Sequence, residues 1–214
     1  MGEIQRTNRL GMAGVRSHLL GLGGTMRSEM RQHTTEGYGG PANYSMEVLR
    51  VRPLDRDGQE VRAWSVDVPS FATVMEGEDA YANFVQTLYI SRLHSEITLT
   101  ISGEVETVDT GGVVSGAAEP FPPVFFLRQT DLTAPDEAIR ALAETAAAAS
   151  DGTALDLAHR LMEAVRGTVD YRIGETHAET TAAQALAQGS GVCQDHAHLF
   201  ISAARHAGLP ARYV

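Results

Sequence analysis

The 214-residue chain has no lysine, only one cysteine and no long hydrophobic run. A single cysteine excludes an internal disulfide, so the cysteine content does not identify the compartment. No apolar run approaches the roughly 20 residues that span a bilayer. The 17 basic residues are all arginines, and a net charge of −10 argues against nucleic acid or an anionic membrane as a partner. We therefore expect a cytoplasmic globular protein that binds neither nucleic acid nor membrane.

The N-terminal half is predicted to be an extension followed by strands. Residues 1–26 are expected to be a disordered extension, and Arg16 and His18 interrupt its apolar residues, which argues against a conventional signal peptide. Alternating apolar and polar residues predict strands over 44–54, 61–68, 84–91 and 96–108. No helical pattern separates them, so an antiparallel β-sandwich or barrel is expected over residues 27–120.

The C-terminal half has a helical pattern. Glycine and proline are frequent between residues 109 and 130, and a linker is expected over 121–130. Helices are predicted over 135–149, over 154–166 and, with Thr180 or Thr181 as cap, up to about Gly189. The chain is therefore predicted to be α+β, with its helical part over residues 131–214.

Cys193 stands where the glycine-rich turn Gly189–Gly191 runs into another helix, which is expected to stop at Gly208. A thiol in the first turn of a helix faces unpaired backbone N–H groups and the positive end of the dipole, which favour a nucleophilic thiolate. Helical spacing places Cys193 on the stripe of Phe200 and Ala203, facing the protein body. The opposite face carries Gln194, Asp195, His198, Ser202, Arg205 and His206. A small buried cysteine without a catalytic role is the alternative.

Several motifs carry a family resemblance. They are Gly191-Val192-Cys193-Gln194-Asp195, Tyr171-Arg172-Ile173, the run ARHAGLPARYV over 204–214 and, upstream, residues 32–35, 49–53 and 79–83. On these motifs the sequence resembles the bacterial transglutaminase-like superfamily, which has a papain-like cysteine-nucleophile fold, over about residues 30–214. Ala82 stands where that family commonly has glycine. The resemblance implies an N-terminal β-domain followed by the N-terminal, helical half of a transglutaminase-like core.

The resemblance also implies a mechanism. The Cys193 thiolate would attack a carboxamide or peptide carbonyl of a protein or peptide substrate, giving a thioester, and an amine or water would then take the acyl group. The backbone N–H of Cys193 is the expected oxyanion donor. No cofactor or metal is expected, because no calcium-type acidic loop is visible and His196 and His198 do not share a helix face.

The family's triad adds a histidine base and an orienting aspartate, which the resemblance places on strands after the final residue, Val214. Both are therefore expected to be absent from this sequence, leaving a reactive thiol without turnover. We also expect the apolar stripe around Ala203 and Ala204 to be partly exposed, so the chain would self-associate or be completed by a second chain. The alternative is a non-catalytic binding or scaffolding protein whose β-domain holds a partner.

Four residues are candidates for supporting the site or binding substrate: Tyr171, Gln194, Asp195 and His198. Asp195 is expected to accept hydrogen bonds at the helix N-terminus, and His198 to make a polar contact with a neighbouring loop. Tyr171 either lines the cleft or is an ordinary core aromatic. His196 could replace the missing base, but three residues along a helix it is more readily a packed residue beside the cysteine.

Overall fold

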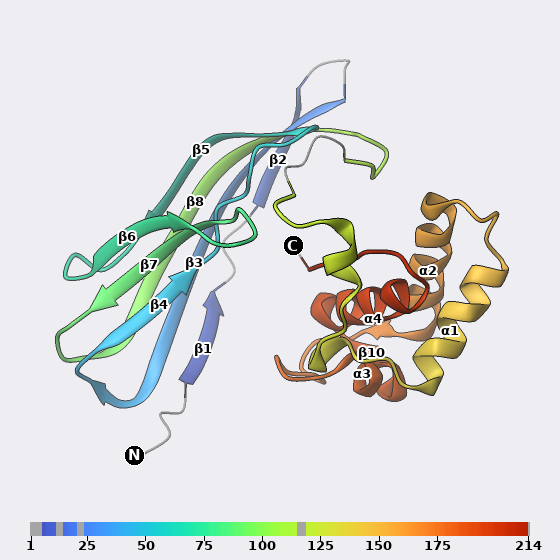
Figure 1. The fold of residues 1–214 in the computed structure, drawn as a ribbon. Helices are drawn as coiled ribbons and strands as arrows, with labels where there is room; N and C mark the ends of the chain where they lie inside the picture. The colour runs from blue at the N-terminus through green and yellow to red at the C-terminus, as the bar shows by residue number, and fades with distance from the viewer. Residues whose placement is uncertain (1–5, 12–14, 21–23, 115–118, 214) are drawn as a thin grey trace. The chain divides into compact units, whose positions relative to one another are not determined.

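The computed structural model describes residues 6–11, 15–20, 24–114 and 119–213. The chain divides into two compact units, Met1–Pro120 and Phe121–Val214 (Figure 1). The first unit contains the long strands and the second contains the α-helices, so the predicted α+β class is confirmed. Residues 121–130, expected to form a linker, group with the helical unit. There the 3₁₀ helix η1 (Pro123–Leu127) buries Phe126, whose carbonyl accepts a hydrogen bond from the N–H of Ala211.

The larger sheet of the first unit is five-stranded and antiparallel. Its strands are β1 (Arg6–Gly11), β2 (Val15–Leu20), β3 (Thr25–Ala42), β5 (Gln59–Asp67) and β8 (His94–Val108). β3 pairs with β8 along one edge, and with β1 and β2 along the other. Over residues 6–11, 15–20 and 25–26 the structure thus has strands in place of the disordered extension expected over residues 1–26; residues 1–5, 12–14 and 21–23 lie outside the described residues. The 18-residue β3 has a long edge of main-chain N–H and C=O groups that need hydrogen-bond partners. β1 and β2 supply these partners through their own main chains, which does not require an alternating side-chain pattern.

A three-stranded antiparallel sheet packs on the larger one. Its strands are β4 (Ser45–Leu49), β6 (Thr73–Glu78) and β7 (Phe84–Ile90), with β7 in the middle. Leu88 and Ile90 of β7 form one buried cluster with Ile97 and Leu99 of β8. The predicted alternation is confirmed from Ile97 to Ile101, beyond which residues 102–107 are all half-buried, and the two sheets form a sandwich-like core.

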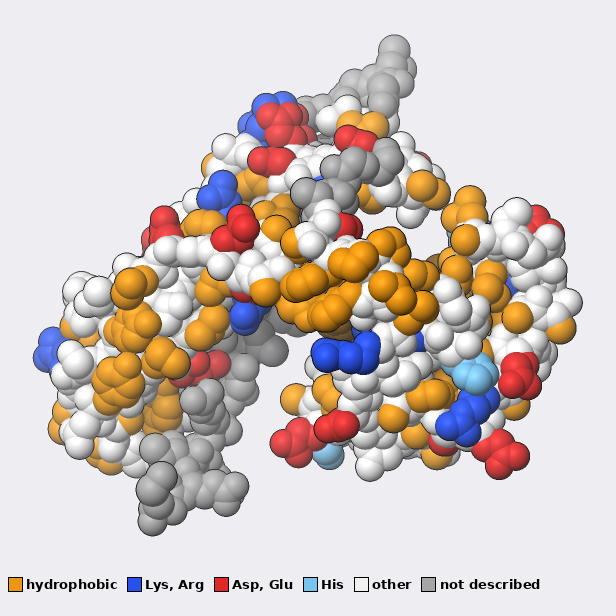
Figure 2. All heavy atoms as spheres, in the orientation of Figure 1, with side chains coloured by type: hydrophobic (Ala, Val, Ile, Leu, Met, Phe, Trp, Pro, Cys, Tyr) orange, Lys and Arg blue, Asp and Glu red, His pale blue; other side chains and the backbone are white. Residues whose placement is uncertain are grey.

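β6 has no counterpart among the predicted strands. All of its residues are exposed, so burial imposes no alternation on its sequence. Backbone pairing with β7 holds it in the sheet. Met75 of β6 and Met46 of β4 are exposed, and Figure 2 shows hydrophobic side chains gathered over this sheet. The strand is therefore determined by its neighbour and not by its own pattern.

The turn from β6 to β7 is organised by Asp79. Its carboxylate accepts hydrogen bonds from the N–H groups of Tyr81 (2.9 Å) and Asn83 (3.1 Å), and from Arg50 Nε (2.7 Å). The Arg50 guanidinium, with these further donors, holds the pKa of Asp79 well below its usual range. Within this turn Ala82 adopts a φ of 61°, in the left-handed region. A glycine at this position would adopt that conformation without strain.

We predict that Ala82→Gly stabilises the first unit. A left-handed conformation costs a non-glycine residue about 1–2 kcal/mol, and the added chain entropy of glycine offsets roughly 0.5–1 kcal/mol of the gain. Urea unfolding followed by the fluorescence of Trp64, the only tryptophan, measures the change. Ala80→Gly is the control, because no left-handed φ is found at that position, and it should lower stability. An Ala82→Gly variant no more stable than the parent would contradict the prediction.

The second unit contains four α-helices and two short strands. They are α1 (Glu137–Ala148), α2 (Ala154–Thr168), β9 (Asp170–Tyr171), α3 (Ala182–Gln188), β10 (Ser190–Gly191) and α4 (Cys193–His206). Thr181, one of the two residues predicted as the cap, caps α3 with its side chain, whereas α1 begins two residues later than predicted because Asp136 is its N-cap. Ile139, Leu161 and Leu199 are central to the buried core that joins α1, α2 and α4. Among the described helices, none has the length and apolar character needed to cross a membrane.

Candidate active site

Cys193 is the first residue of α4 and is reached through a tight turn. α3 ends at Gly189, whose φ of 70° is left-handed, and β10 then pairs in parallel with β9. Val192 is extended and directly precedes the helix. At the other end, Gly208 has a left-handed φ of 83°, which confirms the predicted stop. The thiol thus lies at the N-terminus of a helix, and its side chain is exposed.

The burial of α4 corrects the prediction from helical spacing. Cys193 was expected to face the protein body, yet it is exposed, whereas Asp195, His198 and Ser202 from the supposed outer face are buried. α4 lies against α1, α2 and α3, so more than one of its faces is covered. Ala203 is 0% exposed, so the expected exposure of the apolar stripe is wrong at this position.

Asp195 closes the turn that carries the cysteine. Its side chain is 1% exposed, and Oδ2 accepts hydrogen bonds from the N–H of Val192 (2.7 Å) and from Thr176 Oγ1 (2.6 Å). A carboxylate in the first turn also interacts favourably with the positive end of the helix dipole. Thr176 lies 19 residues before Asp195 and was not predicted as a site residue, because no local pattern connects a loop threonine to a distant helix.

Gly191 leaves no room for a side chain beside this carboxylate. A Cβ at Gly191 would lie 2.6 Å from Asp195 Oδ2 and 2.7 Å from Asp195 Cβ. A Cβ atom is essentially never found this close to a nonbonded atom, and the buried Asp195 has little freedom to move. The glycine of the Gly191-Val192-Cys193 motif is therefore required by close packing, because its φ does not lie in the left-handed region.

His196 is placed as a structural residue and not as a base for Cys193. Its Nδ1 lies 2.9 Å from the carbonyl oxygen of Val192, and its Nε2 lies 3.0 Å from the carbonyl oxygen of Val169. Both ring nitrogens therefore face main-chain carbonyls. The ring joins the start of α4 to the residue before β9, and within the described residues neither nitrogen is hydrogen-bonded to the thiol.

Tyr171 and Gln194 lie close to the same turn. Tyr171 pairs with Gly191 across β9 and β10, and its side chain is 55% exposed, which excludes the ordinary core aromatic considered from sequence. Its ring centroid is 6.3 Å from that of His196. Gln194 Nε2 donates to the carbonyl of Ala178 (3.0 Å), so it joins the loop before α3 to the helix start.

His198 makes an aromatic contact in place of the polar loop contact expected from sequence. Its ring packs edge-on against Tyr213, with centroids 5.9 Å apart. The side chain is 8% exposed, and Nδ1 is buried without a partner in the described part of the chain. Ser202 Oγ, one turn along the same helix, is likewise buried without a partner there. His198 is therefore enclosed within the helical unit, on a different face of α4 from Cys193.

Taken together, the described residues place an exposed thiol at the first residue of α4, beside a turn held by hydrogen bonds to Asp195. Within residues 6–11, 15–20, 24–114 and 119–213, Cys193 Sγ has no hydrogen-bond partner. In the same ranges, no group of three or more His, Cys, Asp or Glu side chains is placed to hold a metal ion. This arrangement is suited to attack on an electrophilic carbon by a sulfur atom at the N-terminus of a helix.

Comparisons with known families divide the chain in the same way. Residues 29–106 match the bacterial transglutaminase-like N-terminal region, and residues 140–214 match the core of the transglutaminase-like superfamily. The first match lies within the β-unit, and the second covers α2, α3 and α4 and most of α1.

Two individual proteins are similar over most of the chain. An uncharacterized protein of Mycobacterium leprae (strain TN) is 28% identical over 193 residues, which is 83% of this chain and 66% of that protein. The chain thus spans just under two thirds of the length of this relative. The crystal structure of a proposed cysteine protease from Cytophaga hutchinsonii superimposes with a TM-score of 0.63 at 15% identity, covering 96% of this chain and 67% of that one. At this identity the superposition shows a shared fold.

Proposed function

Because the chain belongs to the transglutaminase-like superfamily, with a bacterial transglutaminase-like N-terminal region before the core, we propose that Cys193 is a nucleophile for acyl transfer or amide hydrolysis. The observation that carries this proposal is the exposed thiol at the first residue of α4. The proposed substrates are proteins or peptides, which offer either a side-chain carboxamide or a peptide bond.

The proposed reaction has two steps. In the first, the Cys193 thiolate adds to the carbonyl carbon, the C–N bond breaks, and the nitrogen leaves with a proton as ammonia or an amine. The acyl group is then held as a thioester on Sγ. In the second step, a primary amine or water attacks the thioester and releases an amide or a carboxylic acid, and the thiol is regenerated.

The backbone around Cys193 supports the first step. N–H groups in the first turn of a helix have no intrahelical acceptor, so the N–H of Cys193 is free of the helix ladder and can donate to the oxyanion. The hydrogen bonds from Val192 and Thr176 to Asp195 fix the direction in which this turn presents its N–H groups. Tyr171 is exposed beside the turn, and we propose that its ring contacts the bound substrate.

Proton transfer to the leaving nitrogen requires a group that is not among the described contacts of Cys193. His196 is engaged by two carbonyls, and His198 packs against Tyr213. We therefore expect both the acylation of Cys193 and the later turnover to be slow in the 214-residue chain, unless another segment or chain supplies the base.

Incubation with a glutamine-containing peptide and a fluorescent primary amine tests the proposal. Intact-mass analysis is expected to find at most one acyl group per chain, labile to hydroxylamine as a thioester is, and absent in Cys193→Ala. Acylation that persists in Cys193→Ala would contradict the role of the thiol. Repeated, Cys193-dependent transfer to the amine would support the nucleophile and overturn the expectation of slow turnover.

A further inference from the structure

In the described part of the larger sheet, one edge of β8 is unpaired where β5 ends before β8 does. β8 pairs with β3 from Glu96 onward, but it pairs with β5 only from Thr100 to Thr107. Within the described strands, the segment Ser95–Leu99 therefore has no partner on the side of β5. At about 3.4 Å per residue this free edge is roughly 17 Å long, enough for a strand of about five residues.

The chain leaves β5 at this point for a local reason. Proline follows Val68, and Pro69 has no N–H with which to continue the ladder. A turn closed by the N–H of Ala72 and the carbonyl of Pro69 (2.9 Å) then directs the chain toward β6. Val68 and Ala72 pack against the sandwich core, so this departure is held in place by burial.

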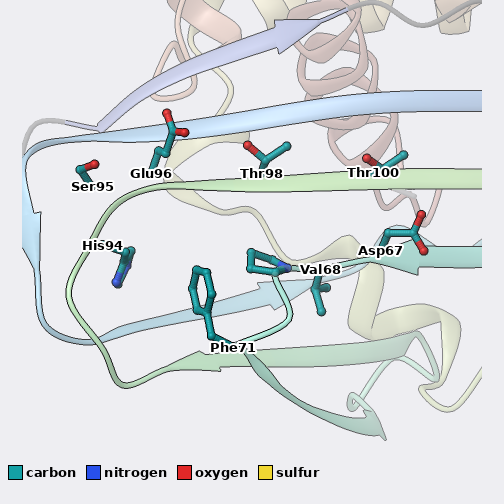
Figure 3. A pocket seen from close by; sticks show the side chains of 9 residues that line it. Asp67, Val68, Phe71, His94, Ser95, Glu96, Thr98 and Thr100 are labelled. Carbon is teal, nitrogen blue, oxygen red and sulfur yellow. The ribbon is translucent and has the colours of Figure 1, made fainter.

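A pocket of about 510 Å³ lies along the free edge. β8 contributes Ser95, Glu96 and Thr98 to its lining, and the departing chain contributes Pro69 and Phe71. Figure 3 shows Phe71 and His94 on one side of β8, with Thr98 standing on the strand itself. This volume lies in the range of pockets that bind small ligands. In addition, every second residue of β8 along the pocket directs its main-chain N–H and C=O toward the unpaired edge.

The charges around the pocket favour a basic occupant. Asp67 at the end of β5 and Glu96 on β8 are both exposed and both line the pocket. Neither carboxylate forms an ion pair within the described residues. The nearby guanidinium of Arg92 lies over the Phe71 ring, 4.9 Å from its centroid, and forms no ion pair with either carboxylate among the described residues. An arginine or lysine side chain would therefore meet two unpaired carboxylates.

We propose that this edge binds an extended basic peptide, which adds to β8 as a short strand in the place that β5 vacates. Main-chain hydrogen bonds to Ser95–Leu99 supply affinity, and Asp67 and Glu96 select basic side chains on alternate residues. The site lies in the first unit and does not depend on Cys193 or on the proposed acyl transfer. It gives the β-domain a binding role of its own.

Fluorescence anisotropy with the labelled pentapeptide acetyl-Val-Arg-Val-Arg-Val-amide tests the proposal on the whole chain. The same peptide with glutamate in place of arginine should not bind. The variant with both Asp67→Asn and Glu96→Gln should bind about tenfold more weakly, since two exposed charge pairs are lost. The matched variant with Glu76→Gln and Glu78→Gln on β6 removes the same charge elsewhere and should bind like the parent.

Two N-methylated peptides separate strand addition from simple charge attraction. Methylation of the amides that face β8 should abolish binding, whereas methylation of the alternate amides should be tolerated. Amide hydrogen exchange should slow at Ser95–Leu99 when the peptide is bound. Equal binding of both methylated peptides, or of the glutamate peptide, would overturn the proposal. A dimer of the chain that protects Ser95–Leu99 without peptide would also overturn it, because a second copy would then be the occupant.

Discussion

Replacing Asp195 with alanine should lower the free energy of unfolding of the helical unit by about 1–3 kcal/mol. The substitution removes the acceptor for the N–H of Val192 and for the Thr176 hydroxyl, and it leaves these two half-buried donors without this partner. Because this turn positions Cys193, alkylation of the thiol should slow as well. Urea unfolding followed by circular dichroism at 222 nm reports on this unit, which contains all of the described α-helices.

Two controls separate the turn from general charge effects. Glu137→Ala removes an exposed carboxylate from the first turn of α1 and should change stability by less than about 0.5 kcal/mol. Asp195→Asn keeps one oxygen that can accept from Val192, so it should restore much of the lost stability and of the thiol reactivity. An Asp195→Ala variant as stable and as reactive as Glu137→Ala would show that the carboxylate does not hold the turn.

Gly191→Ala should be similarly disruptive, for a steric reason. The new Cβ would lie within 2.8 Å of three Asp195 atoms, and Asp195 is buried, so the turn must distort. Forcing an extra carbon into a packed site typically costs about 1–3 kcal/mol. Thermal and urea unfolding should both show the loss, and Cys193 alkylation should slow as the start of α4 shifts.

Gly167→Ala provides a matched control with the opposite expected sign. Gly167 lies in α2, and a Cβ there would meet no atom within 4 Å. Alanine favours a helix over glycine by roughly 0.8–1 kcal/mol, so this variant should be more stable than the parent. A gain of stability in both glycine variants would show that the turn accommodates a Cβ at Gly191 at little cost. Close packing against Asp195 would then not be the reason for glycine at this position.

Local patterns predicted the helices of the second unit and part of the sheets of the first. The alternation over residues 96–108 predicted β8, because burial of one face imposes a period of two. The cap at Thr181 and the stop at Gly208 followed from backbone chemistry that operates within a few residues. β1, β2, β3 and β6 were not predicted. Edge pairing with β3 or β7 holds β1, β2 and β6 and leaves no periodic signature, and of the residues in β3 only Ala42 is buried.

The candidate site was predicted in outline only. The turn motif placed Cys193 at a helix start, and that position is what the structure shows. Its exposure was predicted wrongly, because helical spacing assumes one buried face and α4 is covered on several. The hydrogen bond from Thr176 to Asp195 and the carbonyl contact from Val169 to His196 depend on tertiary packing. No pattern within one segment could have shown them.

The central claim is that the α4 N-terminus makes Cys193 a nucleophile, and its alkylation rate tests this most directly. Cys193 is the only cysteine, so iodoacetamide labelling at neutral pH reports on this thiol alone. The rate is compared between the folded chain and the same chain unfolded in urea. Faster labelling in the folded state is predicted, because only there do the helix N–H groups stabilise the thiolate. Labelling that is equal or slower in the folded state would contradict the claim.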